Sequence, residues 1–228
     1  MPVFQLTDKL IFPRPDLAGE DGLLAIGGDL SEKRLLLAYS LGIFPWYSEG
    51  YPILWWSTDP RLILLPEELT VSRSLHRTLR EHEFIVTMDT AFEEVIGHCA
   101  SARRKNQPGT WITDEMREAY LRLHRSGYAH SVESWKDGKL AGGLYGISLG
   151  AVFFGESMFA IKSNASKAAF ATLVRQLQEW DFKLIDCQMT TGHLLSFGAK
   201  EIARDEFMKR LGKGLEMPAR KGVWKTEK

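Results

Sequence analysis

Apolar positions in the first sixty residues follow no regular spacing, because Pro, Gly and Trp interrupt them repeatedly. One short apolar run predicts a strand at 23–26, and Ser31 is placed to cap a helix that ends near Leu41. The stretch that follows holds three of the seven tryptophans and few helix signals. We therefore expect a small domain, residues 1–60, that packs on a neighbour. It should end near Asp59-Pro60, because the residue before Pro disfavours helix.

Beyond residue 60, segments with helical periodicity alternate with apolar runs typical of strands. Helices are predicted at 72–81, at 90–99, from 113 to near 127, at 165–180, near 193 and from about 205. Strands are predicted at 84–88, 129–135, 139–147, 150–159 and 183–188. In this order, helices come first, three meandering strands follow, and a helix and a strand come after them. The order predicts a mixed α/β (α+β) domain. It spans residues 61–228 and is built around a mostly antiparallel sheet.

Capping and turn residues define several of these boundaries. Thr90 and Glu93 have the spacing of a capping box, and Thr113 and Asn164 are placed to cap the helices that follow them. Between two predicted strands, Asp137-Gly138 is a strong signal for a type I′ hairpin.

The composition is that of an ordinary globular chain of 228 residues, 44% hydrophobic and 25% charged. The N-terminus lacks the pattern of a secretory signal, and no apolar run approaches the length of a membrane span. Cys99 and Cys187 stand in apolar surroundings, so we interpret them as reduced packing residues. These features predict a cytoplasmic protein that does not enter a membrane.

Charge is balanced over the whole chain but unevenly distributed. Residues 1–70 carry 5 basic and 10 acidic side chains, whereas residues 200–228 carry 9 and 5. The acidic N-terminal third argues against nucleic-acid binding through the whole surface. A local contact stays open, because phosphate affinity depends on a few clustered Lys and Arg.

One candidate for such a contact is a basic stripe, which consists of Arg73, Arg77 and Arg80 at helical spacing. The alternative is an ordinary solvated helix face, which is the usual meaning of this pattern. The run Arg103-Arg104-Lys105 follows in a loop and is left unassigned.

Two acids stand inside apolar strands, where a carboxylate is costly unless it is paired or functional. Alternation along 183–188 places Asp186 and Gln188 on one face, with Ile185 and Cys187 on the other. A carboxylate and an amide two residues apart can bind each other and a ligand amine. The structural alternative is a solvated edge strand.

The second acid, Glu156, follows Gly155, which favours a β-bulge that would re-aim the carboxylate. The alternative here is a structural acid paired with Lys or Arg. A serine hydrolase fits poorly, although Ser157, Asp186 and His193 follow the order of a triad. The final Gly of the nucleophile elbow is replaced by Phe, and no helix begins directly after the serine. The histidines show no metal-ligand spacing, so no metal is expected.

Several long motifs follow one another along most of the chain. In order, they are GLLAIGGDLS, LLLAYSLGIFPW, ILWWSTDPR, TWI, HSVESW, GGLYG, FFGESMF, NASKAA and LIDCQ. Together they resemble the leucyl/phenylalanyl-tRNA–protein transferase family. Several aromatic-rich matches in a fixed order are far more specific than a single glycine motif.

This resemblance implies a cytoplasmic bacterial aminoacyltransferase without a cofactor. Such an enzyme moves Leu or Phe, and less readily Met, from its tRNA to the N-terminal Arg or Lys of a protein. The product then enters the Clp protease pathway. Expected partners are the acceptor stems of leucyl-tRNA and phenylalanyl-tRNA, together with the acceptor proteins. We expect a monomer with a small N-terminal domain and a GNAT-like (acyl-CoA N-acyltransferase-like) C-terminal domain.

The resemblance also assigns catalytic roles. It makes Asp186 the base, oriented by Gln188, and places Glu156 against the α-amino group of the transferred residue. An ordinary Asp is a weak base, so Asp186 either has a raised pKa or acts by orienting the amine. A third possibility leaves proton transfer to the terminal ribose of the tRNA.

For the aminoacyl side chain, the resemblance implies an apolar pocket with walls from Trp46, Trp111, Phe153, Met158 and Ile185. Plain core packing is the alternative for such residues. At Leu144, Leu173 and Leu177 this chain departs from the best-known members of the family, which have Met or Phe there, so the ranking of donors is open. The basic stripe matches a family patch that touches the tRNA acceptor stem.

Two rival functions have discriminating features. An acyl-CoA acetyltransferase needs a glycine loop that opens a helix, and the nearest string, Lys209-x-x-Gly212-x-Gly214, lies after a helix. A noncatalytic tRNA-binding adaptor has no need of the set formed by Glu156, Asp186 and Gln188.

Overall fold

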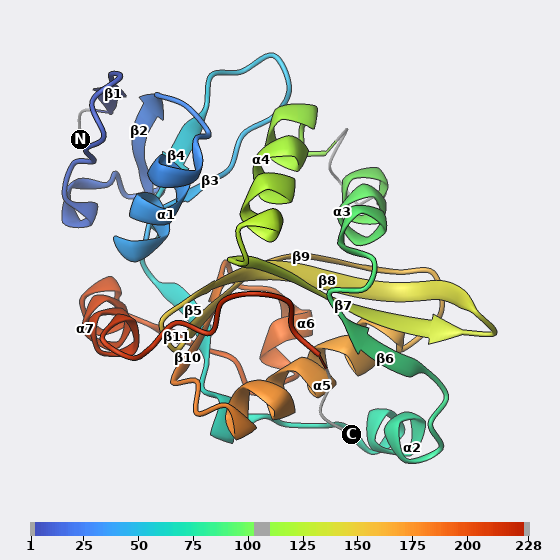
Figure 1. Ribbon diagram of the computed structural model, residues 1–228. Coiled ribbons are helices and arrows are strands. Elements are labelled where there is room, and N and C mark those ends of the chain that lie inside the picture. Colours follow the sequence, from blue (N-terminus) through green and yellow to red (C-terminus); the bar gives the residue numbers. More distant parts are fainter. Residues whose placement is uncertain (1–2, 103–109, 226–228) are drawn as a thin grey trace.

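The computed structural model describes residues 3–102 and 110–225. The run Arg103-Arg104-Lys105 lies outside these ranges. Within them the chain forms a small N-terminal lobe and a larger mixed α/β unit (Figure 1), as the hydrophobic pattern predicts.

The N-terminal lobe is a four-stranded sheet with one α-helix. Its strands lie in the order β1-β2-β4-β3, with β1 and β2 parallel and the other pairs antiparallel. Its elements are β1 (Phe4–Leu6), a 3-10 turn (Pro15–Leu17), β2 (Leu23–Gly27), α1 (Glu32–Ser40), β3 (Phe44–Pro45) and β4 (Leu54–Trp56).

The larger unit is built on a seven-stranded sheet in the order β11-β5-β10-β9-β8-β7-β6. Its strands are β5 (Arg61–Leu64), β6 (Ile85–Met88), β7 (Ala129–Lys136), β8 (Lys139–Leu149), β9 (Val152–Ala160), β10 (Leu184–Gln188) and β11 (Lys200–Ile202). All neighbouring pairs are antiparallel except β9 and β10. The expected mostly antiparallel sheet is therefore confirmed.

Helices cover both faces of this sheet. In Figure 1, α3 and α4 lie above it and α5 lies below it, while α7 lies beside β5 and β11. The helices are α2 (Arg73–Arg80), α3 (Phe92–Ser101), α4 (Asp114–Arg125), α5 (Ala165–Glu179), α6 (Gly192–Leu195) and α7 (Arg204–Leu215), with a 3-10 turn at Pro66–Glu68.

The sheet separates two apolar cores. Phe154 belongs to the core under α3 and α4, and the preceding Phe153 belongs to the core under α5, as strand alternation requires. The first core continues into the N-terminal lobe through Leu24 and Trp55, both 0% exposed. The lobe thus shares its core with the larger unit. Whether residues 1–60 form a separate domain stays a prediction.

Several predicted caps and turns are confirmed. Ser31 and Thr113 accept hydrogen bonds from backbone N–H groups three residues later, at 3.4 and 3.2 Å. The hairpin at Asp137-Gly138 has φ values of 53° and 70°, as a type I′ turn requires.

The predicted cap at Thr90 is wrong, and the cap at Asn164 is confirmed in its position but not in its side-chain bond. The helix after Thr90 starts at Phe92, and its first turn is capped from a distant strand, because Ala91 N–H donates to Glu133 on β7. The Thr90 hydroxyl also donates to Glu133. Asn164 occupies the N-cap position of α5 with φ 65°, but its side chain makes no cap bond and donates to Thr78.

Candidate active site

A cavity of about 440 Å³ lies where the N-terminal lobe meets β8, β9, β10 and α6. The size is typical of small-molecule sites. Its walls are mostly apolar and include Phe44, Pro45, Trp46, Trp111, Leu144, Phe153, Met158, Phe170, Ile185 and Leu194. Glu156 is the carboxylate that lines the cavity among the described residues. An apolar chamber with one acid can hold an apolar side chain beside a cation.

A bulge on β9 brings Glu156 into this chamber. On β8, Tyr145 pairs with Ser157 and Gly146 pairs with Gly155, so Glu156 is the extra residue without a partner. The bulge expected from Gly155 is confirmed. It interrupts alternation beyond Glu156. The carboxylate bonds Tyr39, which also contacts Phe154, whereas Met158 packs against the core that contains Phe153.

A second bulge re-aims the end of β10. Asp186 pairs with Ile63 and Gln188 pairs with Leu62 on β5, so Cys187 is the extra residue. Gln188 has φ 61° and lines the cavity together with Ile185 and Cys187. The expectation that Asp186 and Gln188 share a face is therefore wrong, because alternation does not continue through a bulge.

The two bulges lie where β9 and β10 separate. Their parallel pairing ends at Asp186 and Phe154. Just beyond, the Gln188 side-chain amide donates to Glu156 Oε1 across the gap at 2.9 Å. The opening between two neighbouring strands thus carries the polar end of the cavity.

Two buried tyrosines also hold the Glu156 carboxylate. Tyr39 on α1 donates to Oε1 at 2.7 Å, and Tyr120 on α4 donates to Oε2 at 2.8 Å. The two phenol oxygens also lie within hydrogen-bonding distance of each other. Because each phenol has a single proton, a phenol that donates to the other does not donate to Glu156 at the same time. Burial, followed by the nearby Glu156 carboxylate, raises the pKa of both tyrosines, so they remain proton donors.

Burial raises the pKa of Glu156 to about 7. The three hydrogen bonds from Tyr39, Tyr120 and Gln188 favour the charged form, but they only partly offset the loss of hydration. A carboxylate offers about four lone-pair positions. Within the described part of the chain, Oε1 has two donors and Oε2 has one, so one position on Oε2 is left for a ligand.

Asp186 lies on the other face of β10, outside the cavity lining. Both of its oxygens accept from Arg61 on β5, Oδ1 from Nε at 2.8 Å and Oδ2 from Nη2 at 2.7 Å. Oδ1 also accepts from the Gln188 backbone N–H at 2.9 Å. The Arg61 guanidinium lies between the rings of Phe44 and Phe207, at 4.8 and 4.6 Å. Asp186 thus fixes the backbone that presents Gln188.

Three other side chains near the cavity could in principle act as nucleophile or base, but their environments do not support that role. Burial raises the pKa of the Cys187 thiol, so this cavity residue acts as an apolar wall. Ser157 stands inside β9 rather than at a strand-to-helix turn. His193 lines the cavity, and burial lowers its pKa. With Asp186 paired to Arg61, these residues do not form a triad.

Across residues 3–102 and 110–225, no group of three or more His, Cys, Asp or Glu side chains is arranged to hold a metal ion. Within the same ranges, no helix has the length and apolar character needed to cross a membrane.

The geometry can be compared with known families. A family profile described as "Leucyl/phenylalanyl-tRNA protein transferase" matches residues 63–212, and the profile of the N-terminal domain of the same family matches residues 28–59. The chain belongs to the leucyl/phenylalanyl-tRNA–protein transferase family.

Relatives with that name are similar over nearly their full length. One from Desulfatibacillum aliphaticivorans is 59% identical over 100% of this chain and 97% of its own. Another, from Anaeromyxobacter sp. (strain Fw109-5), is 58% identical over 98% of this chain and 95% of its own.

Among solved structures, similarity is weak. L-PGS from Bacillus licheniformis has a TM-score of 0.41 at 11% identity, over 74% of this chain and 54% of its own. A likeness at this level has no bearing on fold or function.

Most pocket residues implied by the family resemblance meet at the cavity. Six line it: Trp46, Trp111, Leu144, Phe153, Met158 and Ile185. Leu173 and Leu177 on α5 are 0% exposed and lie in the core that also contains Phe153. They are not among the lining residues, so any influence on the cavity is indirect.

The basic stripe lies elsewhere. Arg73, Arg77 and Arg80 are exposed on α2, and Arg77 pairs with Glu81 at 2.8 Å. Figure 1 places α2 beyond α5, at the opposite end of the molecule from β1 and β2.

Sequence reasoning missed three polar residues of the site: Arg61, Tyr39 and Tyr120. Arg61 ends the motif ILWWSTDPR, and a cation beside a strand is a signal that one of the buried acids has a partner. The tyrosines gave no local signal, because α1 and α4 meet β9 only in the folded chain.

We predict that Arg61→Met lowers the free energy of unfolding by about 3–5 kcal/mol, because it leaves a buried carboxylate without its counter-ion. Urea denaturation measures this loss. In the control Arg14→Met, the free energy should be nearly unchanged, because Arg14 and its partner Asp16 are 81% and 47% exposed. An equal, small effect in both variants would contradict the structural role of the buried pair.

A second prediction concerns pH. A carboxyl group whose folded pKa lies above its unfolded value stabilises the fold at low pH. Stability is therefore lost as pH rises from about 4.5 to about 7. In the wild type, this effect should lower the free energy of unfolding by about 2–3 kcal/mol between pH 4.5 and pH 7. In Glu156→Gln, which lacks the titrating group, this decline should be absent. The measurement is urea denaturation of both proteins at intervals from pH 4.5 to 8.

Glu94→Gln, at an exposed position, is the matched control, and its free energy of unfolding should fall with pH as it does in the wild type. Parallel curves for wild type and Glu156→Gln would show that the Glu156 pKa is not raised.

Proposed function

We propose that this chain transfers leucine or phenylalanine from aminoacyl-tRNA to the N-terminal Arg or Lys of acceptor proteins. The observation that carries the proposal is an apolar cavity with one carboxylate, in a chain of this family. A Leu or Phe ester has matching parts, an apolar side chain and an α-amino group. The product would carry an N-terminal residue that marks it for proteolysis.

We place the transferred side chain against the walls formed by Trp46, Trp111, Phe153, Met158 and Ile185. A hydrophobic pocket distinguishes side chains that differ by one methylene by about 1–3 kcal/mol. That range permits a preference among Leu, Phe and Met without excluding any of them. Leu144 narrows the same cavity and contributes to the ranking.

Glu156 is proposed to bind the α-amino group of the transferred residue through the open position on Oε2. Tyr39, Tyr120 and Gln188 fix the carboxylate before the donor arrives, so little reorganisation is needed. This arrangement explains why an acid is kept in an otherwise apolar chamber.

Asp186 is proposed to act by orienting Gln188 rather than by removing a proton itself. Arg61 occupies both Asp186 oxygens, and the Gln188 N–H occupies one of them as well. The acceptor amine attacks the ester carbonyl, the C–N bond forms and the ester C–O bond breaks. The amine proton passes to the departing ribose oxygen, which leaves as the hydroxyl of the tRNA. Because the ester is already activated, positioning supplies much of the catalysis.

The basic stripe is proposed to contact phosphates of the tRNA acceptor stem. Its three arginines are exposed on one face of α2, which suits phosphate-directed binding with little sequence readout. A solvated helix face remains the alternative.

The larger unit is proposed to have a GNAT-like fold. Its mixed sheet has one parallel pair, β9 and β10, that separates at the cavity, which suits an acyl-transfer site. We further propose a cytoplasmic monomer of two domains that uses no cofactor. An acyl-CoA donor is disfavoured, because Lys209, Gly212 and Gly214 lie inside α7 rather than in a loop before a helix.

The proposed function predicts transfer of labelled leucine from tRNA to a peptide with N-terminal Arg, but not to the same peptide with N-terminal Ala. Asp186→Asn should lower turnover at least about tenfold and leave the KM for tRNA within about twofold, since orientation affects the transition state. Steady-state kinetics with both peptides measure these values.

Binding of tRNA without transfer would favour the adaptor alternative. A near-wild-type turnover for Asp186→Asn would remove this residue from the proposed mechanism while leaving the function intact.

For the basic stripe, Arg77→Glu should raise the apparent KM for aminoacyl-tRNA and reduce the salt slope of log KM by about one, the value expected for one phosphate contact. Arg14→Glu, on the exposed surface of the N-terminal lobe, is the control. An unchanged slope in Arg77→Glu would mean that the stripe is a solvated face.

A further inference from the structure

The chain after α7 returns across the large sheet (Figure 1), and close to the end of its described part Trp224 contacts Phe153, which lines the cavity. Trp224 in this segment is 2% exposed. The segment is held along its length: the guanidinium of Arg220 lies 3.9 Å from the Trp180 ring centroid, and Gly222 N–H donates to the Gly127 carbonyl. The approach at Gly127 is close enough that a side chain there would collide with Gly222.

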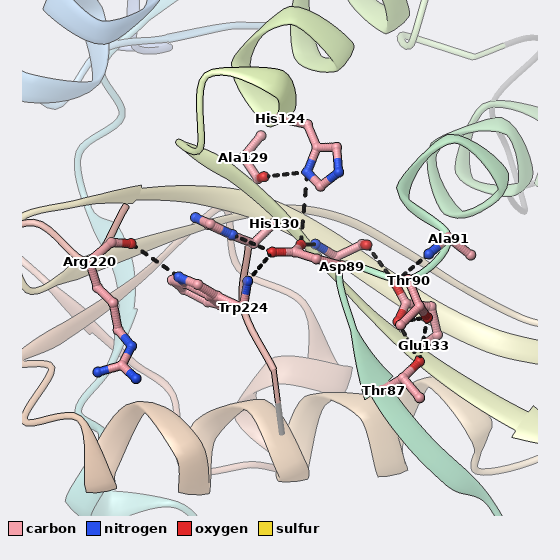
Figure 2. Close-up of polar contacts among 11 residues, drawn as sticks. Thr87, Asp89, Thr90, Ala91, His124, Ala129, His130, Glu133, Arg220 and Trp224 are labelled. Carbon is pink, nitrogen blue, oxygen red and sulfur yellow. Dashed lines mark hydrogen bonds and ion pairs between the residues drawn. The ribbon is translucent and has the colours of Figure 1, made fainter. Parts of the chain in front are cut away.

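The segment is anchored by a polar cluster that the proposed chemistry does not use (Figure 2). Asp89, whose side chain is 0% exposed, accepts from the Trp224 backbone N–H at 2.7 Å. It also accepts from Ser131 N–H at 2.9 Å and lies 2.9 Å from His130 Nδ1. One buried carboxylate thus joins the end of β6, the start of β7 and the C-terminal segment.

The indole of Trp224 fills the space behind a wall of the cavity. It stacks on His130, with centroids 3.7 Å apart and planes 6° from parallel. Burial lowers the pKa of His130, so this partner is a neutral ring. The indole also meets Phe153, with centroids 6.0 Å apart, and packs edge-on to Trp180 and Phe182.

Phe153 is the link to the cavity, because it both lines the cavity and contacts Trp224. On another side the β8 backbone confines its ring. A Cβ at Gly146 would lie 2.5 Å from Phe153 Cζ, which is closer than a Cβ atom and an aromatic carbon can approach. The Phe153 ring is therefore held between β8 and the indole. If the indole were removed, the Phe153 ring could move into the space that Trp224 occupies.

We propose that Trp224 is a specificity-positioning residue: the C-terminal segment Arg220–Trp224 supports Phe153 from behind and so sets the room available to the transferred side chain. This inference rests on the proposed function. Without the indole, Phe153 relaxes away from the cavity and the cavity widens. Leucine then loses wall contacts, whereas the larger phenylalanine gains room.

The test is the ratio of kcat/KM for phenylalanyl-tRNA to that for leucyl-tRNA, with one N-terminal Arg peptide as acceptor. Trp224→Leu should shift this ratio at least about fivefold towards phenylalanine, within the range for one poorly fitted methylene. Trp224→Phe keeps a ring against Phe153 and should restore most of the wild-type ratio. All proteins are assayed well below their melting temperatures.

Two controls separate positioning from general stability. Val223→Ala changes the neighbouring residue, which is 71% exposed, and should leave the ratio unchanged. Phe84→Leu removes a buried ring from a separate small core and should lower the melting temperature without changing the ratio. If Trp224→Leu does not fold, His130→Leu removes the stacking partner and should shift the ratio in the same direction.

A ratio that stays constant in the folded Trp224 and His130 variants would overturn the inference, even if both rates fall together. Affinities for non-hydrolysable 3′-amide analogues of leucyl- and phenylalanyl-adenosine give a second readout without transfer. A shift in their ratio supports the inference even if transfer fails. Absence of transfer by wild type would instead count against the proposed function.

Discussion

The buried ion pair between Arg61 and Asp186 holds β5 to β10 at the point where β10 separates from β9. A buried ion pair is stable only if both charges are present and further hydrogen bonds offset the loss of hydration. Here the Gln188 N–H and the rings of Phe44 and Phe207 complete the surroundings. The pair thus connects the sheet, the N-terminal lobe and α7, and it fixes the backbone that presents Gln188 to the cavity.

On the other side of the gap, Glu156 depends on residues from distant parts of the chain. Tyr39 comes from the N-terminal lobe and Tyr120 from α4, so the lobe contributes directly to the polar end of the cavity. This arrangement gives a physical reason for a small lobe whose core merges with that of the larger unit. A carboxylate with a pKa near 7 is the electrostatic result of burying an acid among neutral donors.

Much of the fold could be predicted from the sequence, because its signals are local. The helices beginning after Ser31 and Thr113 and the hairpin at Asp137-Gly138 follow from capping and turn chemistry. The bulge at Glu156 could also be anticipated, because the preceding glycine permits it. Two predicted side-chain cap bonds do not form, for a common reason. The Thr90 and Asn164 side chains bond instead to Glu133 and Thr78, which are distant in sequence.

The sequence by itself determined the α-helices, the strands β2 and β6 to β10, the two acids that had to be paired or functional, and the family. The short strands β1, β3, β4, β5 and β11 were not predicted, although β5 carries Arg61. The tertiary structure decided which acid faces the cavity. A bulge at Cys187 turned Gln188 towards Glu156, while Asp186 stayed outside the cavity, paired with Arg61. Strand alternation is a property of neighbouring residues and can be read from the chain. The pairing of a buried charge depends on which distant strands and helices come together, and only folding brings them there.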